Sequence, residues 1–216
     1  MIDPFELLVG SGGPSADPVR VFGVTVGIVT NNKDPDGLGR VKIKLPWLMD
    51  AYESTWARIA TPMAGSSRGL YLLPEVDDEV LVAFEHGQLE FAYILGALWN
   101  GKDKPPESNS DGKNNKRTLK SRSGHVITLD DTDGSEKIQI IDKSGKNSVV
   151  LSTADNTITI SADADISITS KNGKLKLSGQ GIEITSQAAV KLEANQGVEL
   201  KATGQMTIKG ATVNIN

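Results

Sequence analysis

The sequence TITISADADISITSKNGKLKLSGQGIEITSQAAVKLEANQGVELKATGQMTIKG (157–210) decides the fold, because it repeats. Pairs of apolar residues two positions apart recur along it, and the first members of successive pairs lie 8, 9, 7, 8, 8 and 8 residues apart. Residues that favour turns fill the gaps between the pairs. We expect the pairs to form a shared β-helix core; they are Ile158 and Ile160, Ile166 and Ile168, Leu175 and Leu177, Ile182 and Ile184, Val190 and Leu192, Val198 and Leu200, and Met206 and Ile208.

Each repeat unit predicts a short strand with one dry face and one wet face, followed by a turn. Burying two aliphatic side chains contributes roughly 3–6 kcal/mol, whereas ordering eight residues costs about 1–2 kcal/mol for each backbone unit. A single unit is therefore unstable, and the units must stack. Either one chain coils on itself as a solenoid, or three chains interlace around an axis. We favour an intertwined trimeric β-helix over residues 154–216, because it buries strand edges that a short solenoid leaves open.

The composition changes near residue 107. All nine prolines and all ten aromatic residues lie before it, and the turn-rich segment KDKPPESNSDGKNNK (102–116) marks the boundary. Residues 19–106 contain five or six short alternating runs, which is typical of a small antiparallel barrel such as the OB-fold. Within RVKIKLPWL (40–48), for example, Val41, Ile43 and Leu45 share one face. We expect the barrel core to form around the aromatic residues Trp47, Trp56, Phe84, Phe91, Tyr93 and Trp99.

Residues 107–153 predict a linker followed by neck strands. Alternating runs occur at HVITLDD (125–131), EKIQIID (136–142) and NSVVLST (147–153), and turn residues separate them. No stretch of the chain shows sustained helical periodicity. The predicted fold class is therefore all-β, with an N-terminal OB-fold barrel followed by an intertwined trimeric β-helix.

Charge and cysteine content exclude several classes of function. The formal net charge is −4, whereas a general nucleic-acid binder needs a basic surface, so no nucleic-acid partner is expected. Without cysteine the chain has no disulfide, thiolate nucleophile or iron–sulfur ligand, and two histidines are too few for a His-rich metal site. No apolar run reaches the roughly 18–20 residues that span a bilayer. The N-terminus lacks the basic start of a signal peptide, so we expect any export to use a route other than the general secretory pathway.

Several polar clusters superficially suggest chemistry. Asp34, Asp36 and Gly37 suggest a calcium loop, but the acidic ligand at the twelfth position of an EF-hand is missing, so we expect a structural turn. The acidic run Glu75, Asp77, Asp78 and Glu79 could offer paired carboxylates for glycoside hydrolysis, but a solvated loop is the simpler interpretation.

The histidines and the basic run also have structural interpretations. Neither His86 nor His125 has the neighbours of a catalytic triad. The basic residues Lys113, Lys116, Arg117, Lys120 and Arg122 are expected in a solvated linker. We therefore predict no catalytic residues, no metal ligands and no cofactor, and a protein that is not an enzyme.

Three segments together resemble the OB-fold domain of the baseplate spike family, which includes phage tail spikes, VgrG-like type VI secretion proteins and the spikes of phage-tail-like injection particles. They are VGIVTNNKDPDGLGRVKIKLPWL (26–48), WARIATPMAGSSRGLYLLPEVDDEVLVAFEHG (56–87) and YILGALWNGKDKPP (93–106). Further along, SRSGHVITLDDTDGSEKIQIIDKSG (121–145) resembles the neck of these spikes, and the octads resemble their shaft. The resemblance covers about residues 20–216.

The resemblance implies a homotrimeric, structural central spike that pierces a target envelope and contacts the target membrane transiently. A separate hub protein would bind at the OB-fold end, with residues 1–18 as the hub-contacting segment. A PAAR-type tip protein would bind at the other end, on Val213, Asn214, Ile215 and Asn216. Assembly would take place in the cytoplasm, within a phage-like particle or secretion apparatus. An iron-bearing apex is not expected, because no histidine follows His125.

Two other classes of function remain open at this stage. One is an OB-fold module that binds carbohydrate or nucleic acid, which leaves the repeat without a role. The other is a β-helix enzyme that degrades polysaccharide, although the repeat offers only scattered carboxylates at Glu183, Glu193 and Glu199. The mass in solution separates them from the spike, which must be a trimer.

Overall fold

The computed structural model describes residues 20–48 and 52–214. Within these residues the chain is all-β, with twelve strands and one short 3-10 turn, η1 (Glu85–Gly87). Contacts divide the chain into two units, which meet in sequence at Asp163 and Ala164. The expected hub-contacting segment 1–18 lies outside the described residues, as do Ile215 and Asn216 of the expected tip-binding end.

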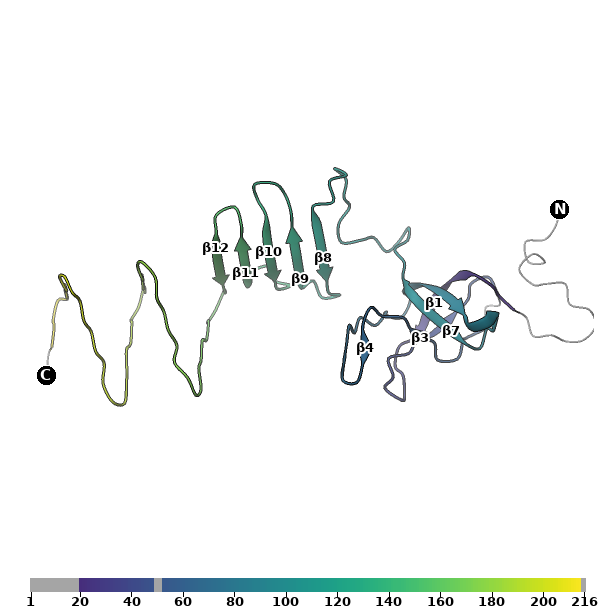
Figure 1. Ribbon diagram of the computed structural model, residues 1–216, viewed down its shortest axis with the longest axis horizontal. Helices are drawn as coiled ribbons and strands as arrows, with labels where there is room; N and C mark the ends of the chain where they lie inside the picture. The colour runs from purple at the N-terminus through teal and green to yellow at the C-terminus, as the bar shows by residue number, and fades with distance from the viewer. Residues whose placement is uncertain (1–19, 49–51, 215–216) are drawn as a thin grey trace, which may run out of the picture. The chain divides into compact units, whose positions relative to one another are not determined.

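Residues 24–97 form a five-stranded barrel in the order β2-β1-β6-β7-β3 (Figure 1). Its strands are β1 (Val24–Asn31), β2 (Lys42–Lys44), β3 (Arg58–Ile59), β6 (Glu79–Phe84) and β7 (Ala92–Ala97). Strands β3 and β7 pair in parallel, whereas the other neighbours are antiparallel. A bridge between Val41 and Ala57, with N···O distances of 3.0 and 2.8 Å, joins the β2 and β3 ends of the sheet and closes the ring. This arrangement confirms the predicted OB-fold.

The barrel core is aliphatic. Val41, Ile43 and Leu45 fall on the inner face, as the alternation of 40–48 predicts. The predicted aromatic core is wrong in most members: Phe84 is buried, but Phe91 is 52% exposed and Trp99 is 69% exposed. A ring of short strands leaves a narrow interior that Val and Ile side chains fill. The buried hydrophobic residues are Val21, Val29, Val41, Ile43, Leu45, Ala57, Val80, Val82, Phe84, Ala92 and Ile94.

The remaining aromatic rings lie at the edge or outside of the barrel. Trp47 is half-buried against the core. The Lys42 ammonium lies 5.5 Å from the centre of the Trp56 ring, and the Arg58 guanidinium lies 5.2 Å from that of Tyr93. These rings therefore pack against cationic side chains on the outer surface. Between β3 and β6, a loop carries a small hairpin of β4 (Ala64–Gly65) and β5 (Arg68–Gly69).

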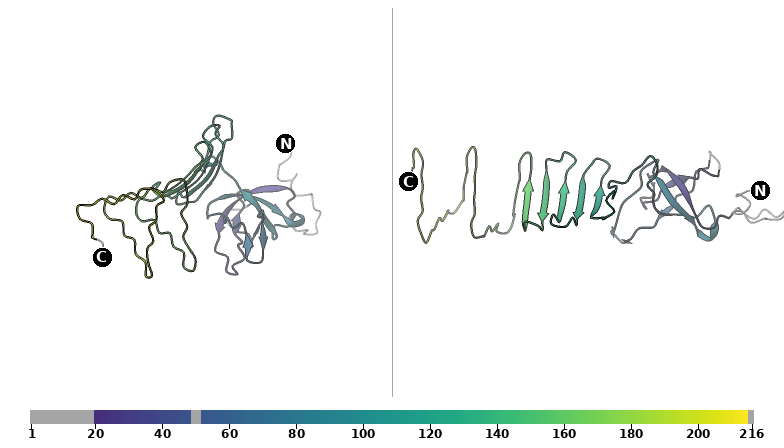
Figure 2. Two further views of the ribbon diagram at one scale, coloured as in Figure 1. Left: turned by 60° about the vertical axis from the view of Figure 1, so that its left-hand side comes forward. Right: turned by 90° about the horizontal axis from the view of Figure 1, so that it is seen from above.

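A second sheet follows the barrel, and its five strands lie side by side in chain order (Figures 1 and 2). Every neighbouring pair is antiparallel. The strands are β8 (Lys116–Lys120), β9 (Val126–Asp130), β10 (Lys137–Ile141), β11 (Ser148–Ser152) and β12 (Thr157–Ser161). The basic run at 116–120 is therefore a strand, where we expected a linker. Strand β12 carries Ile158 and Ile160, so the sheet extends past residue 153 into the first repeat unit.

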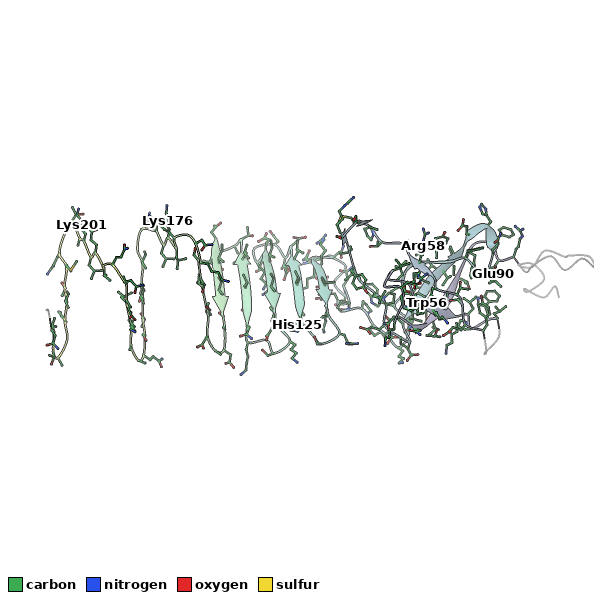
Figure 3. All side chains as sticks on the ribbon, turned by 90° about the horizontal axis from the view of Figure 1, so that it is seen from below. Trp56, Arg58, Glu90, His125, Lys176 and Lys201 are labelled. Carbon is green, nitrogen blue, oxygen red and sulfur yellow. The ribbon has the colours of Figure 1, made fainter. Side chains whose placement is uncertain are left out.

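The C-terminal unit consists of extended segments separated by bends, and Figure 3 shows Lys176 and Lys201 on it. Bends begin at residues 163, 171, 179, 187, 195, 203 and 211, which is a constant spacing of eight. The bend at 171–173 is one residue longer than the others, and it absorbs the shift in register of Leu175 and Leu177. Each segment between bends therefore carries one apolar pair of the repeat, and the described residues after Ser161 form no strand pairing within the chain.

Candidate assembly surface

One face of the second sheet is built from two straight rows of apolar side chains. Residues that oppose each other across an antiparallel pair point to the same side, so the strand register fixes which residues share a face. The first row runs through Leu119, Ile127, Ile140, Val149 and Ile160, and the second through Leu129, Ile138, Leu151 and Ile158. We call these nine residues the apolar face.

The apolar face is open to solvent in the single chain. Eight of its members are 38–70% exposed, and Val149 is half-buried. The opposite face of the sheet carries the polar residues Thr128 and Gln139 together with the half-buried Val126, Ile141 and Val150. It is the better shielded of the two faces, and Thr128 is only 9% exposed. The linker lies over it, with the Thr118 hydroxyl donating to the Glu107 carboxylate at 3.1 Å. The face with the two rows of large aliphatic side chains is therefore the more exposed one, as happens where another protein surface covers it.

Short polar side chains fix the turns that set the register of this sheet. After β10, the Asp142 carboxylate accepts hydrogen bonds from the Ser144 hydroxyl at 2.7 Å and from the Asn147 amide at 2.9 Å. These donors, together with the backbone N–H groups of the same turn, lower the pKa of Asp142 to about 2. After β9, the hydroxyl and the backbone N–H of Thr132 likewise lower the pKa of Asp130. Both turns prefer the ionised carboxylate, which stabilises the meander at neutral pH.

The second row of the apolar face ends at a charged pair. Arg117 stands opposite Leu129 on the edge strand β8, and its guanidinium pairs with Asp131. It also donates to the carbonyl of Asn114 at 3.2 Å. The apolar surface is thus limited at β8 and continues without interruption to β12.

The repeat pairs beyond the sheet keep the spacing of the apolar face. Ile158 and Ile160 belong to both, since they end the two rows on β12. The other twelve residues predicted for the core, from Ile166 to Ile208, lie in the C-terminal unit, where each is 48–69% exposed in the single chain. Val213 is 48% exposed as well. The two-residue spacing that identifies the repeat also occurs in the second sheet, at Ile127/Leu129, Ile138/Ile140 and Val149/Leu151. Leu119 lacks this signal, because the residue two positions before it is Arg117.

The suspected calcium loop is a closed structural turn. The Asp34 carboxylate accepts from Nε and Nη2 of Arg40 at 2.8 and 2.7 Å, and from the backbone N–H of Leu38 at 3.0 Å. Its side chain is only 3% exposed. The Arg40 guanidinium holds the pKa of Asp34 well below its usual range. Both carboxylate oxygens are occupied by donors of the protein, so the turn offers no cation site.

The other polar clusters lie apart from one another. Glu75 pairs with Arg122, with an N···O distance of 3.0 Å. His86 and His125 are exposed, and Nδ1 of His125 accepts from the backbone of Lys143 at 3.3 Å. Among the described residues, no three His, Asp or Glu side chains are close enough together to hold a metal ion. In the same part of the chain, no helix is long and apolar enough to cross a membrane.

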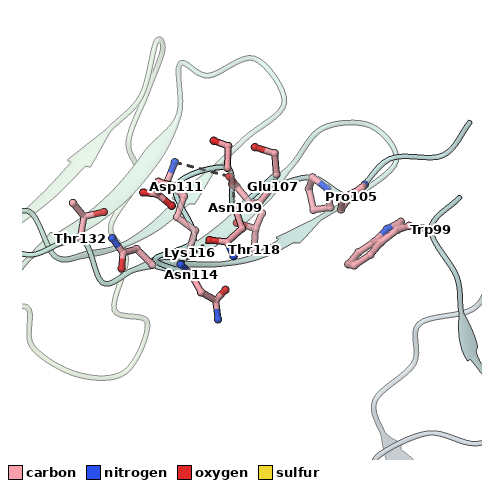
Figure 4. Close-up of a pocket in the computed structure, with 13 residues that line it drawn as sticks. Trp99, Pro105, Glu107, Asn109, Asp111, Asn114, Lys116, Thr118 and Thr132 are labelled. Atoms are coloured by element: carbon pink, nitrogen blue, oxygen red, sulfur yellow. Dashed lines mark hydrogen bonds and ion pairs between the residues drawn. The ribbon is translucent and has the colours of Figure 1, made fainter. Parts of the chain in front are cut away.

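A polar hollow lies where the linker folds beside β8, with Trp99 and Pro105 on one side (Figure 4). Its polar groups mostly serve the linker itself. The Asn109 side chain accepts from the backbone of Asn114 at 2.7 Å, and that of Asp111 from the backbone of Lys113 at 3.1 Å. These bonds shape the turn 109–114. The hollow therefore belongs to the linker that lies over the sheet face opposite the apolar face.

Known proteins share the barrel. Residues 25–99 match the family described as the type VI secretion system/phage-baseplate injector OB domain. In this region the chain is similar to VgrG-like baseplate and spike proteins. It is 31% identical over 113 residues to the type VI secretion system spike protein VgrG3 of Vibrio cholerae, a match that covers 48% of this chain and 11% of that protein.

Two further relatives carry similar names. The type VI secretion system spike protein VgrG2a of Pseudomonas aeruginosa is 29% identical over 82 residues, which covers 36% of this chain and 10% of the relative. The actin cross-linking toxin VgrG1 of Vibrio cholerae is 29% identical over 115 residues, which covers 49% of this chain and 10% of the relative. This VgrG-like chain spans about a tenth of the length of the curated relatives it matches.

Proposed function

We propose that this chain is the structural central spike of a contractile injection machine and that it acts as a homotrimer. The observation that carries the proposal is the apolar face, which one chain leaves open over five strands. Three copies that turn these faces toward a common axis would enclose them in a triangular core. Covering each large aliphatic side chain contributes about 1.5–3 kcal/mol, and every copy supplies nine such residues.

The repeat extends the same design. The pairs at Ile166/Ile168 and beyond occur once per eight-residue segment, and none of these segments pairs with another described segment of its own chain. Backbone N–H and C=O groups of extended segments need partners. Interlacing three chains would supply both the missing ladders and the cover for the apolar pairs, which is the predicted intertwined β-helix. The support for this step is the constant spacing of the bends and the exposure of every pair.

In the machine, the trimer would join a separate hub protein at the OB-fold end and pierce the target envelope with its shaft, contacting the target membrane transiently. It would be assembled in the cytoplasm and delivered to or through the envelope of a target cell. We propose no enzymatic step, because the suspected carboxylate and histidine sites lie apart or are already paired within the protein.

The mass in solution tests the proposed trimer. Light scattering of the full chain should give three times the 23.0 kDa of one chain, at concentrations from low to high micromolar. A mass of one chain would overturn the spike. It would favour instead a monomeric OB-fold carbohydrate-binding module or a β-helix enzyme that degrades polysaccharide.

The expected tip protein is a separate question. Val213 and Asn214 are exposed at the end of the described chain, and Ile215 and Asn216 complete the predicted tip-binding segment. A trimer end offers unpaired backbone groups and a small apolar surface to a PAAR-type partner. Deleting residues 211–216 should abolish capture of a tip protein while the mass stays that of a trimer. Undiminished capture would show that the tip binds elsewhere.

A further inference from the structure

On β1, β6 and β7, both the inner and the outer side of the barrel wall are apolar. Side chains alternate along each strand, so the neighbours of the buried residues Val29, Val82 and Ile94 point outward. Strands that are apolar on both faces are typical of sheets that are covered on both sides. The outward residues, which we call the outer patch, are Val24, Val26, Ile28, Leu81, Ala83 and Leu95.

The register makes the outer patch continuous. Val24 stands opposite Ala83, which stands opposite Tyr93, and Val26 stands opposite Leu81 in the next row. In the single chain, Val24 is 58% exposed and Leu95 is 44% exposed. An antiparallel barrel that faced only water here would carry polar residues at these positions. The outer patch therefore needs a cover that the described part of this chain does not provide.

A second apolar surface lies at the loops that follow β1 and β3. Met63, Leu70, Tyr71 and Leu72 project from the loop between β3 and β6, and Leu38 projects from the loop between β1 and β2. Tyr71 is 74% exposed and Leu38 is 70% exposed. The loop is held in shape, because the Thr61 hydroxyl donates to the carbonyl of Leu70 at 2.8 Å and the hairpin β4–β5 closes beside it. We call these five residues the loop patch.

Charges at the two patches are complementary. Arg68 lies on the hairpin beside the loop patch and makes no ion pair with any described residue. Glu85 and Glu90 flank the start of β7, next to the outer patch, and they too lack an ion-pair partner in the described ranges. Arg58, which stacks on Tyr93, offsets one of these two carboxylates. Beside Ile28, Glu79 on β6 and Lys44 on β2 add one charge of each sign. In the loop that carries Leu38, Arg40 pairs with both Asp34 and Asp36, and the exposed Lys33 offsets the remaining carboxylate. The outer patch thus has a net negative border, and Arg68 gives the loop patch a net positive one.

We propose that the loop patch of one copy packs on the outer patch of the next, so that three barrels close a ring. The inference rests on the proposed trimer and adds the contact that its barrels make. A threefold axis relates copies head to tail, so each interface must join two different surfaces, and each copy must present both. The outer patch and the loop patch are two such surfaces on one barrel, and their borders carry opposite charge.

The absence of cysteine allows a direct test in the full-length protein. The first measurement is the labelling rate of a single thiol by a maleimide, in Leu95→Cys and in the control Lys102→Cys, whose side chain is exposed after the end of β7 and belongs to neither patch. A thiol covered by a neighbouring copy reacts only through local opening. Leu95→Cys should therefore react at least roughly tenfold more slowly than Lys102→Cys in the native protein, and at the same rate in denaturant.

The second measurement identifies the cover. Leu95→Cys, Val24→Cys and Val26→Cys are each combined with Tyr71→Cys or Leu72→Cys, oxidised, and run without reductant on a denaturing gel. A disulfide forms only where the two Cβ atoms come within about 3.5–4.5 Å. At least one combination should give a covalent ladder that ends at three chains, whereas each single variant, and Lys102→Cys combined with Tyr71→Cys, should stay a single chain.

The outcomes separate this inference from the trimer itself. A mass of one chain would remove the proposed function and the ring together. A trimer whose Leu95→Cys thiol reacts as fast as the control would keep the spike and overturn the ring. A trimer with a slow thiol but no ladder in any combination would overturn the loop patch as the cover. A dimer band from a single variant would show a symmetric contact between outer patches, which also contradicts the ring.

Discussion

On the inner side of β6 and β7 in the barrel, the large aliphatic side chains are buried within one chain, whereas on the apolar face of the second sheet the same residue types remain exposed or half-buried. Val80, Val82 and Ile94 have no measurable exposure, while Ile138 and Ile140 are 44% and 49% exposed. Both regions place large aliphatic residues at alternate positions along their strands. The difference is that the barrel closes on itself and the meander stays a single layer.

A single layer of strands has no core of its own. Stable β-domains pack two layers or close into a barrel, because each sheet must bury one face against something. Among the described residues of the second sheet, only the polar side chains of Thr128 and Asp130 are buried. The barrel core is therefore complete within one chain, whereas the second sheet leaves its apolar face uncovered.

The strongest way to break this contrast is a charge in the middle of the apolar face. Ile140→Asp places a carboxylate between Ile127 and Val149 in each copy. Burying an unpaired charge costs several kcal/mol, and the trimer would bury three of them. We expect the mass by light scattering to fall to that of one chain, while the barrel keeps its native tryptophan fluorescence.

The matched control is Gln139→Asp, which adds the same charge on the opposite face of the same strand. It should remain a trimer. If both variants trimerise equally well, the apolar face is not the interface, and the proposed spike loses its main support.

A weaker effect of the same kind is expected in the repeat. Ile184→Asp changes one pair among the seven of the repeat, and residues on either side of it still supply apolar cover. It should shift part of the protein from trimer to monomer, whereas the neighbouring Glu183→Ser should not, since exposed polar substitutions usually stay within about 0.5 kcal/mol. Equal trimer fractions, measured by light scattering at the same concentration, would show that residues 164–216 lie outside the shared core.

The sequence predicted the repeats and the barrel better than it predicted what fills the barrel. Alternation and turn residues located β1, β2, β6 and β7, because period two and turn chemistry are local signals. The prediction of an aromatic core was wrong because the size of the side chains decides what fits inside a closed ring of five strands. A periodic pattern does not report side-chain size. Strand β8 was missed because Lys116, Arg117 and Lys120 are typical of solvated charge. Its pairing partners on β9 lie 6 to 14 residues further along the chain, beyond the reach of a local pattern. The difference in exposure between the two faces of the second sheet likewise depends on the linker, which no local pattern reports.

A cavity in the barrel core should destabilise the barrel and leave the trimer intact. Ile94→Ala removes buried side-chain volume from the barrel core, which costs about 2–5 kcal/mol of unfolding free energy. All three tryptophans lie at residues 47–99, so tryptophan fluorescence reports the barrel, whereas circular dichroism reports both regions. We expect the fluorescence transition to move to lower denaturant while the protein remains a trimer.

The control for the cavity is Val76→Ala, at a position 47% exposed in the turn before β6. It should change the barrel stability by less than about 0.5 kcal/mol. Loss of the trimer in Ile94→Ala would instead show that the barrels hold the three copies together. The difference in burial between the barrel core and the apolar face would then not mean that only the second sheet needs other copies.

The smallest expected effect is the acid sensitivity of the second sheet. The pKa of Asp142 is about 2 in the folded protein, against a usual value of 3.8, because the Ser144 hydroxyl and the Asn147 amide bond to the carboxylate. A carboxyl group whose pKa falls on folding stabilises the fold above its unfolded pKa, and that contribution is lost as the pH drops from about 4 to about 2. Asp142→Asn should therefore lower the stability of the sheet at pH 7 and flatten the decline of that stability between pH 4 and 2.

Denaturant unfolding followed by circular dichroism at several pH values measures this stability. Asp133→Asn, in the preceding turn, is the control for removing one carboxylate. A decline as steep in Asp142→Asn as in the unaltered protein would place the acid sensitivity in other groups, of which Asp130 is the first to examine.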